Sequence, residues 1–546
     1  MRRRLLMCSA LLGLGLLSGV YVWARQDVQS VPTHRFFHVQ WGSDQTRPVS
    51  GRLLLFAMTA AAAKAQSKDG PVTEIDADPF EPNGTSIAAE NVDRLVPGQT
   101  IDIDTDQLAF PAAWSKLPAG DYLVQAVLDV HHNYNYLGRD GGDIVSKVVT
   151  VHLPANDIPT LTLDETLPHV DPWAPPASMP TSLLPALEAA HKQSQQIDFV
   201  SPSLSAFWGR PIHMLGRVLL PPGYEPSQAK RYPTVYFTHG FGGNIDRLAR
   251  VLAYVQDGMS RGQMPPMIWV FLDESSATGT HEFADSVNNG PWGQALTTEL
   301  IPYLESHYRM DGNAKGRFLN GHSSGGWATL WLQTRYPAIF GGTWSTSPDP
   351  SDFHDFTGPD LYAPHANVYR KPDGTPWPLV RDKGKVIGTF EQFARMERVL
   401  GPYGGQMASF EWVFSPRGKD GRPEQMFDRD TGEVDPAVVA YWHDHYDIAY
   451  RLQQHWPALK PDLDGKIHLY VGTADTFYLD GAAHRLEGVL DGLHAHADFR
   501  FIPGRTHFDL YKIGDDNYGL LKQISWDMYA VARPDSKLKP GMNPSP

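Results

Sequence analysis

Residues 316–337 read GRFLNGHSSGGWATLWLQTRYP. A short apolar strand pattern over 316–320 leads into Gly-His-Ser-Ser-Gly at 321–325, and a helical pattern follows from 326 until Pro337 ends it. A serine that projects from a sharp turn between a strand and a helix needs glycines on both sides, because a Cβ there would clash with the neighbouring elements. The stretch therefore predicts a strand, a strained turn that presents Ser323, and a helix.

This arrangement is typical of a nucleophilic serine at the carboxyl end of a parallel strand, as in the α/β-hydrolase fold. The alternative is an ordinary glycine turn whose serine has no chemical role. The strand before Ser323 and the helix after it favour the first interpretation.

Strand and helix patterns alternate on both sides of this stretch. Short apolar runs at 232–237, 267–272, 466–471 and 498–502 suit buried parallel strands, and 298–308 has the spacing of a helix. Such alternation predicts a parallel α/β sheet. Residues 347–459 interrupt it with Pro, Gly, Asp and aromatic residues, so we expect an insertion or cap there.

The chain before residue 154 has a different pattern. From about Arg35 to Leu153 apolar residues recur with period two between turn residues, which predicts short β-strands. We expect an all-β, immunoglobulin-like sandwich over 30–160 and a proline-rich linker over 161–195. An α/β-hydrolase domain over 196–532 and a flexible tail over 533–546 complete the prediction.

Composition supports a globular chain of more than one domain. The 546 residues, 42% of them hydrophobic and 20% charged, exceed what one core organises. The net charge of -14 argues against nucleic-acid binding, which needs a local excess of cations. The single cysteine, Cys8, excludes a disulfide framework, a zinc-thiolate site and a cysteine nucleophile in the mature chain.

Residues 1–24 have the composition of a secretory signal peptide. Three arginines at 2–4 precede an uncharged apolar run, 5–22, and Val22-Trp23-Ala24 offers a cleavage site. We expect a secreted or periplasmic protein. The alternative is an uncleaved membrane anchor formed by residues 5–22.

A serine hydroxyl becomes a nucleophile when a histidine accepts its proton and a carboxylate orients that histidine. Asp475 follows the strand pattern 466–471, and His507 follows the pattern 498–502, so both occur in the chain order that an α/β-hydrolase requires. Asp480 and Asp509 are poorer candidates for the acid, because Asp480 begins a helix and Asp509 lies beyond the histidine.

A tetrahedral intermediate also needs two backbone N–H donors. The residue after the nucleophile, Ser324, is the first candidate. The glycine-rich loop Thr-His-Gly-Phe-Gly-Gly at 238–243 follows the strand pattern 232–237 and can bring a second N–H, that of Phe241, beside Ser323. A simple turn at the end of the strand is the alternative for this loop.

Four sequence stretches carry a resemblance to a known family. LLPPG at 219–223, YPTVYFTHG at 232–240, NNGPWG at 288–293 and GHSSGG at 321–326 resemble, in this order, the esterase family of α/β-hydrolases. This family includes feruloyl esterases, S-formylglutathione hydrolases, enterochelin esterases and mycolyltransferases, and the resemblance covers about residues 211–527.

The resemblance implies a serine esterase that works without a cofactor or metal. Ser323 would be the nucleophile, Asp475 the acid and His507 the base, with Phe241 and Ser324 at the oxyanion. Feruloyl, acetyl or siderophore esters are the implied substrates, small or linked to a glycan. The net charge predicts no nucleic acid as partner, and the apolar run 5–22 predicts a membrane contact only through that run; the oligomeric state is not predicted.

Three other interpretations stay open. The pairs His443/His445, His354/Asp355, His281/Glu282 and His131/His132 could belong to a metallohydrolase, although none has the helical i, i+4 spacing of a zinc site. The chain could transfer its acyl group to another alcohol, or bind envelope or carbohydrate without catalysis.

The aromatic residues of the insertion are expected to form the wall of the substrate site. Among them are Phe353, Phe356, Tyr362, Trp377, Phe410, Trp412, Tyr441 and Trp442. The alternative is that they hold the insertion onto the sheet.

Overall fold

The computed structural model describes residues 34–42, 46–68, 70–134, 138–176, 179–401 and 405–542. The predicted signal peptide or anchor at 1–24 lies outside these ranges. Within them, no helix has both the length and the apolar character that crossing a membrane requires.

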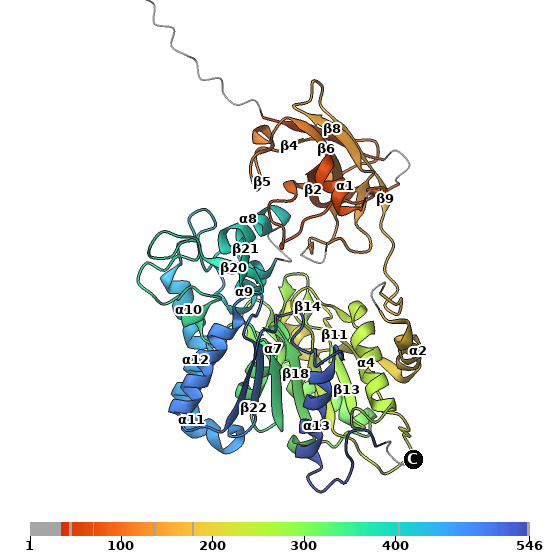
Figure 1. Ribbon diagram of the computed structural model, residues 1–546, viewed down its shortest axis with the longest axis vertical. Helices are drawn as coiled ribbons and strands as arrows, with labels where there is room; N and C mark the ends of the chain where they lie inside the picture. The colour runs from red at the N-terminus through yellow and green to blue at the C-terminus, as the bar shows by residue number, and fades with distance from the viewer. Residues whose placement is uncertain are drawn as a thin grey trace, which may run out of the picture.

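An eight-stranded sheet forms the centre of the second half of the chain (Figure 1). Its strands, in spatial order, are β10 (Ser194–Val200), β11 (His213–Leu219), β13 (Ile268–Leu272), β12 (Thr234–Thr238), β18 (Arg317–His322), β19 (Gly342–Thr346), β22 (Ile467–Gly472) and β23 (Ala497–Ile502). From β13 to β23 every neighbouring pair is parallel, whereas β10 and β11 pair antiparallel at one edge. The predicted parallel α/β sheet is therefore present.

The central strands are apolar because helices cover both faces of the sheet. Val235 and Phe237 of β12 face one cluster of buried side chains, whereas Tyr236 faces another. The first face is covered by α4 (Ala249–Ser260) and α13 (Gly519–Ala532). The second face is covered by α3 (Pro202–Trp208), α6 (Ile301–His307), α7 (Ser324–Arg335), α11 (Ile448–Leu463) and α12 (Leu479–Gly492).

The edge strand β10 and its neighbour β11 have no counterpart in the predicted set. In β10 only Ile197 is buried, so its sequence SQQIDFV shows no run of apolar residues. It is held by backbone pairing with β11 along its whole length. Residues 194–200 therefore form a strand because of their hydrogen bonds to β11, and a sequence pattern does not reveal such bonds.

The first half of the chain forms a second, nine-stranded sheet. Its strands are β1 (Phe36–Trp41), β2 (Val49–Thr59), β3 (Ser86–Leu95), β4 (Thr100–Asp104), β5 (Ala109–Phe110), β6 (Gly120–Asp129), β7 (Ile144–Ser146), β8 (Val149–Leu153) and β9 (Thr160–Thr166). Hydrogen bonds link all nine, and the sheet branches at β6, which pairs with β2, β7 and β8. An immunoglobulin-like topology stays a prediction.

The predicted linker, 161–195, contains regular structure. Most of β9 lies inside it. This strand forms because the alternating Leu161 and Leu163 are buried in the first sheet beside β1. Helix α2 (Leu184–Gln193) also lies inside it and packs on α4. The described residues of the proline-rich stretch 168–180, between β9 and α2, form neither strand nor helix.

The insertion after β19 folds as a cap. It comprises β20 (Pro378–Asp382), β21 (Lys385–Thr389), α8 (Phe390–Leu400), α9 (Gln406–Phe414) and α10 (Pro436–Tyr446). Figure 1 shows α8 between the first sheet and the rest of the cap. Met396, Val399 and Leu400 of α8 are buried in one cluster with Leu54 and Phe56 of β2. The first sheet is therefore packed directly on the cap.

Short segments complete the structure. They are α1 (Ala60–Gln66), α5 (Trp292–Ala295), the π-helical turn Leu296–Leu300, and the two-residue strands β14 (Ser275–Ser276), β15 (Gly279–Thr280), β16 (Asp285–Ser286) and β17 (Gly290–Pro291). Short 3-10 turns lie at Trp114–Lys116, Thr181–Leu183, Ile245–Arg247, Ala314–Gly316 and Phe353–Asp355.

Candidate active site

Ser323 lies in the turn between β18 and α7, as the sequence predicts. Its backbone has φ 63° and ψ -127°, a conformation that costs energy for a residue with a side chain. The Ser323 N–H donates to the carbonyl of Thr346, and its own carbonyl accepts from Trp327 in the first turn of α7. The neighbouring strand and the helix together hold this strained turn.

The glycines around Ser323 are required by contact. A Cβ on Gly321 would lie 2.1 Å from the carbonyl oxygen of Gly325, and one on Gly325 would lie 2.3 Å from that of His239. Because both obstacles are backbone atoms, neither could move aside easily. This is the clash that the sequence pattern predicts.

Asp475 and His507 come together although 32 residues separate them. Asp475 follows β22 and His507 follows β23, and His507 Nδ1 lies 3.0 Å from Asp475 Oδ2. Both side chains are buried, at 0% and 5% exposure. Burial acts to raise the pKa of Asp475, but the facing His507 and the N–H of Phe477 offset this, so its pKa lies below the ordinary value.

Ser323 and His507 line one cavity, together with Phe241 and Gly242 of the glycine-rich loop 238–243. No hydrogen bond joins Ser323 Oγ to His507 in this structure, both residues being among those described. A hydrogen bond between a nucleophile and its base is often long without substrate and shortens when substrate binds.

The glycine-rich loop after β12 lies beside Ser323. A Cβ on Gly240 would lie 2.9 Å from Ser323 Cβ, and Thr238 Oγ1 donates to the Gly325 carbonyl at 2.9 Å. Phe241 and Gly242 line the same cavity as Ser323. Ser324 is the first residue of α7, so its N–H has no acceptor within the helix. The two predicted donor residues therefore belong to segments that meet at Ser323.

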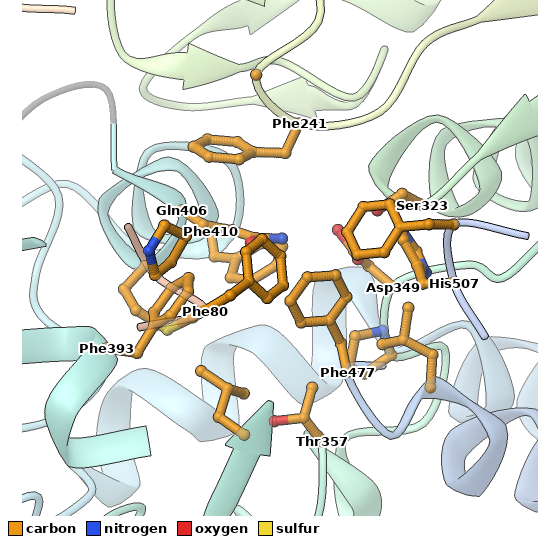
Figure 2. Close-up of a pocket in the computed structure, with 17 residues that line it drawn as sticks. Phe80, Phe241, Ser323, Asp349, Thr357, Phe393, Gln406, Phe410, Phe477 and His507 are labelled. Atoms are coloured by element: carbon orange, nitrogen blue, oxygen red, sulfur yellow. The ribbon is translucent and has the colours of Figure 1, made fainter. Parts of the chain in front are cut away.

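The cavity at Ser323 has a volume of about 170 Å³ and is largely aromatic. Figure 2 shows Ser323, Asp349 and His507 on one side, with Phe80, Phe393 and Phe410 opposite and Phe241 above. Phe80 comes from the first sheet's domain, in the loop between α1 and β3. Its ring lies 6.3 Å from that of Phe477 and 5.6 Å from that of Phe508. The two halves of the chain thus share this cavity.

The expected aromatic wall is mostly elsewhere. Of the eight aromatic residues named above for the insertion, Phe410 lines the cavity, and Phe393 of the same insertion lines it too. Trp442 is fully buried against Phe353 and Phe414, and its indole donates to Ser415. Its role is to hold the cap together. Phe80, Phe393, Phe477 and Phe508 form the wall instead, and three of them lie outside the insertion.

Asp349 is a pocket residue that sequence reasoning missed. It accepts a hydrogen bond from Ser324 Oγ at 2.6 Å, and its N–H donates to the carbonyl of Ser323. Burial raises the pKa of Asp349 to about 6, against the opposing hydrogen bond from Ser324. Its place just after β19, at the carboxyl edge of the sheet, was the available signal.

His322 is a second missed residue. Its ring centre lies 4.4 Å from that of His507, and its Nδ1 lies 3.2 Å from Thr346 Oγ1. Burial, with the nearby His507, lowers the pKa of His322 to about 3. A neutral His322 therefore packs against the predicted base.

The alternative acids have other partners. Asp480 is paired with Arg381 of β20 at 2.7 Å, and Arg381 also donates to the carbonyl of Asp475. Asp509 accepts from the N–H and hydroxyl of Thr506. Neither contacts His507 among the contacts of the described residues.

The histidine pairs considered for a metal make packing and hydrogen-bond contacts. His281 stacks on Trp292 with ring centres 3.6 Å apart, and burial lowers the pKa of His281 to about 3. His354 contacts Asp352, and His445 contacts the carbonyl of Tyr441. Within the described ranges, three residues have candidate metal-ligating atoms within 4.8 Å of one another. They are His34, Asp104 and Asp106, at an edge of the first sheet.

Comparison with protein families identifies an esterase family. The profile of the esterase family described as "Putative esterase" matches residues 205–508, more than half of the chain. The chain belongs to this esterase family.

Two similar curated proteins are Esterase Rv1288 and Esterase MT1326 of Mycobacterium tuberculosis strains H37Rv and CDC 1551. Each is 30% identical over 141 residues, which is 26% of this chain and 30% of the relative. The match thus spans less than a third of the length of these relatives.

Similar solved structures include a ferulic acid esterase from Anaeromyces mucronatus in complex with ferulic acid, at 15% identity and a TM-score of 0.32, covering 60% of this chain and 89% of that one. An S-formylglutathione hydrolase from Agrobacterium tumefaciens is 13% identical, with a TM-score of 0.35 and coverages of 63% and 95%.

Proposed function

We propose that the protein is a serine esterase in which Ser323, His507 and Asp475 form the catalytic triad. Ser323 Oγ attacks the ester carbonyl carbon while His507 Nε2 takes its proton, and Asp475 stabilises the resulting imidazolium through Nδ1. The backbone N–H groups of Phe241 and Ser324 receive the negative charge that develops on the carbonyl oxygen.

The second half of the reaction uses the same groups in reverse. His507 returns the proton to the departing alcohol, which leaves the acyl group on Ser323. A water molecule then gives a proton to His507 and attacks the acyl carbon, and the acid is released when Ser323 recovers its proton. Replacing water by a second alcohol would make the protein an acyltransferase.

One observation carries this proposal. Ser323, on a strained turn whose glycines cannot be replaced, shares a cavity with a buried histidine whose other nitrogen faces a buried carboxylate. A strained backbone and a buried carboxylate are costly for stability, and such costs are typical of a catalytic site.

The cavity favours an aromatic acyl group over an acetyl group. Its volume of about 170 Å³ and its six phenylalanine rings suit a planar, apolar group of about the size of a substituted benzene ring. We therefore propose esters of aromatic acids, such as feruloyl esters, as substrates. A secreted or periplasmic location, which rests on residues 1–24, is part of the same proposal.

The test replaces the nucleophile. Ser323→Ala should lower the turnover of methyl ferulate by about 10⁴-fold or more, because the variant has no hydroxyl to acylate. A fluorophosphonate probe should add its mass once to the wild type at Ser323 and not to the variant. Retention of more than a few per cent of activity, or inhibition by a chelator instead, would contradict the assignment.

A further inference from the structure

A second histidine–aspartate pair lies at the glycine-rich loop 238–243. His239 belongs to this loop, and Asp273 follows the neighbouring strand β13. His239 Nε2 lies 3.0 Å from Asp273 Oδ1, and the two side chains are 6% and 8% exposed. Burial acts to lower the pKa of His239, but the facing Asp273, with Glu274 nearby, outweighs burial and brings this pKa above its ordinary value. A buried charged pair is costly to assemble, and the proposed triad does not use this one.

The other ring nitrogen of His239 contacts the backbone of the same loop. His239 Nδ1 lies 2.9 Å from the carbonyl oxygen of Gly240. A carbonyl oxygen can only accept, so Nδ1 carries a proton and donates it. Nε2 donates to Asp273 when His239 is charged, and accepts the N–H of Glu274, 3.1 Å away, when His239 is neutral. The bond to Gly240 is therefore present in both forms of His239.

The direction of the Gly240 carbonyl also sets the direction of the next N–H. The Gly240–Phe241 peptide bond is trans, so its C=O and its N–H point in opposite directions. Because the C=O points to the ring of His239, the N–H of Phe241 points away from that ring. Both residues lie against the nucleophile, since a Cβ on Gly240 would lie 2.9 Å from Ser323 Cβ and Phe241 lines the cavity at Ser323.

Two glycines leave space for His239. A Cβ on Gly243 would lie 2.7 Å from His239 Nδ1, which is where the ring makes its bond to the loop. A Cβ on Gly325, in the first turn of α7, would lie 2.3 Å from the carbonyl oxygen of His239. His239 thus lies between the glycine-rich loop and the helix that begins with Ser324, the other proposed oxyanion donor.

We propose that His239 is a positioning residue for the oxyanion hole, because its Nδ1–H holds the Gly240 carbonyl and so directs the N–H of Phe241 toward the carbonyl oxygen of the ester. Asp273 orients His239 as the carboxylate of a triad orients its histidine. A donor that is fixed before the reaction stabilises developing charge without reorganisation, so His239 acts on the transition state more than on substrate binding. This inference rests on the proposed esterase mechanism, since it assigns the support of one of its donors.

Two amide variants separate the two nitrogens of His239. The amide nitrogen of His239→Asn can take the place of Nδ1 and donate to Gly240, whereas that of His239→Gln takes the place of Nε2 and donates to Asp273. We expect His239→Gln to lower kcat for methyl ferulate by about 10- to 100-fold with KM within threefold, since loss of an oxyanion donor itself costs about 10²- to 10³-fold. His239→Asn should keep kcat within about fivefold. Equal kcat in the two variants would overturn the proposal.

A trifluoromethyl ketone analogue of the ester reports on the oxyanion contact. Ser323 Oγ adds reversibly to its carbonyl carbon and His507 takes the proton, so the adduct carries an oxyanion at the place where the transition state has one. Its Ki should rise in His239→Gln in proportion to the fall in kcat/KM, and change little in His239→Asn. If His239→Gln instead lowers the Tm and raises KM while Ki stays within threefold of the wild-type value, His239 supports the fold alone and the proposal is wrong.

His281→Asn is the matched control. His281 is also a buried histidine, at 1% exposure, and its ring makes no hydrogen bond to residues 238–243 among the contacts of the described residues. Its Nδ1 accepts the N–H of Phe283, and the amide oxygen of asparagine can do the same. This variant should keep kcat and Ki within threefold. A loss as large as that of His239→Gln would refute the proposal, because any buried histidine near the loop would then have the same effect.

Amide hydrogen exchange separates this inference from the proposed function. Exchange over residues 240–245 should be faster in His239→Gln than in the wild type and in His239→Asn, because the loop loses its bond to the ring. If Ser323→Ala retains turnover, the proposed triad is wrong, and the exchange rates still decide whether His239 holds the loop. Identical exchange in the three proteins would show that it does not, even if ester hydrolysis at Ser323 stands.

Discussion

At the scale of single residues, Asp475 and Asp480 lie only five positions apart in the sequence but have different partners. Asp475 faces His507 from a fully buried position, whereas Asp480 faces Arg381. Burial acts to raise the pKa of Asp475, and the facing His507 together with the N–H of Phe477 brings that pKa below its ordinary value.

Asp475→Asn should lower kcat by about 10²- to 10⁴-fold, because the amide cannot stabilise the imidazolium that forms during acylation. Asp480→Asn is the control and should retain activity within about threefold. Steady-state turnover of methyl ferulate, with circular dichroism to verify folding, measures both. A fully active Asp475→Asn with an inactive Asp480→Asn would move the acid to residue 480.

Glu274 gives a prediction about pH. This residue follows β13, is fully buried, and has no hydrogen-bond partner on either carboxyl oxygen among the described residues. Burial raises the pKa of Glu274 to about 8, while the nearby His239 acts in the opposite direction. Its folded-state pKa is above that of an unfolded chain, so folding favours the protonated acid.

The stability due to this proton is fully present below about pH 4.5 and is lost as pH rises through about 8. Glu274→Gln carries no such proton, so its Tm should increasingly exceed that of the wild type between pH 5 and pH 8.5, by a stabilisation of about 1 kcal/mol or more. Thermal unfolding at several pH values measures this. A Tm difference that does not change with pH would contradict it.

At the scale of elements, loops and helices from distant parts of the chain build the acyl pocket, which is the cavity at Ser323 where we propose that the acyl group binds. Phe80 comes from a loop of the first domain, Phe393 and Phe410 from two cap helices, and Phe508 from the loop after β23. The rings of Phe477 and Phe508 lie 5.0 and 5.4 Å from the imidazole of His507. The ring of Phe80 lies 6.3 and 5.6 Å from these two rings.

Phe80→Ala should therefore change specificity without changing the chemistry. We expect kcat/KM for methyl ferulate to fall by about 10-fold, from lost burial of the substrate ring, and that for an acetyl ester to change by less than threefold. Phe36→Ala, at an exposed phenylalanine of the same domain, is the control. Equal loss on both esters would mean that Phe80 supports the fold and does not contact the acyl group.

The sequence predicts the elements of the catalytic sheet better than the walls of the pocket. Strand and helix patterns predict that Ser323, Asp475 and His507 lie close together, because the carboxyl ends of parallel strands meet at one edge of the sheet. This prediction does not depend on the conformation of the loops. Phe80 could not be assigned in the same way, since its position depends on how two domains pack. Trp442 illustrates the converse: composition alone does not distinguish an aromatic residue that lines a pocket from one that fills a core.

At the scale of the whole molecule, a buried arginine connects the first domain to the active site. Arg52 of β2 is 4% exposed, and its guanidinium donates to the carbonyls of Val399 and Arg398 at the end of α8, the shorter bond being 2.7 Å. A cation at that end also complements the helix dipole. Burial lowers the pKa of Arg52 to about 10, although Asp129 opposes this, so Arg52 is charged at neutral pH.

The contact continues from α8 to the pocket. Glu397 of α8 accepts the backbone N–H groups of Gln406 and Met407, which begin α9. Phe393 of α8 and Phe410 of α9 then enter the acyl pocket. The first domain therefore positions part of the pocket wall through two helices, in addition to supplying Phe80.

Arg52→Met should loosen this connection, because it leaves the last carbonyls of α8 buried without a donor, at a cost of about 1 to 3 kcal/mol. We expect a lower Tm, faster hydrogen exchange over residues 395–401 and 405–410, and a fall of about tenfold in kcat/KM for methyl ferulate. Acetyl-ester turnover should fall less, since Ser323, Asp475 and His507 do not depend on α8.

Arg395→Met, on the exposed side of the same helix, should change none of these quantities. If Arg52→Met lowers the Tm but leaves exchange in α9 and the preference for aromatic esters unchanged, the two domains are joined for stability alone and the pocket wall is positioned by the cap itself.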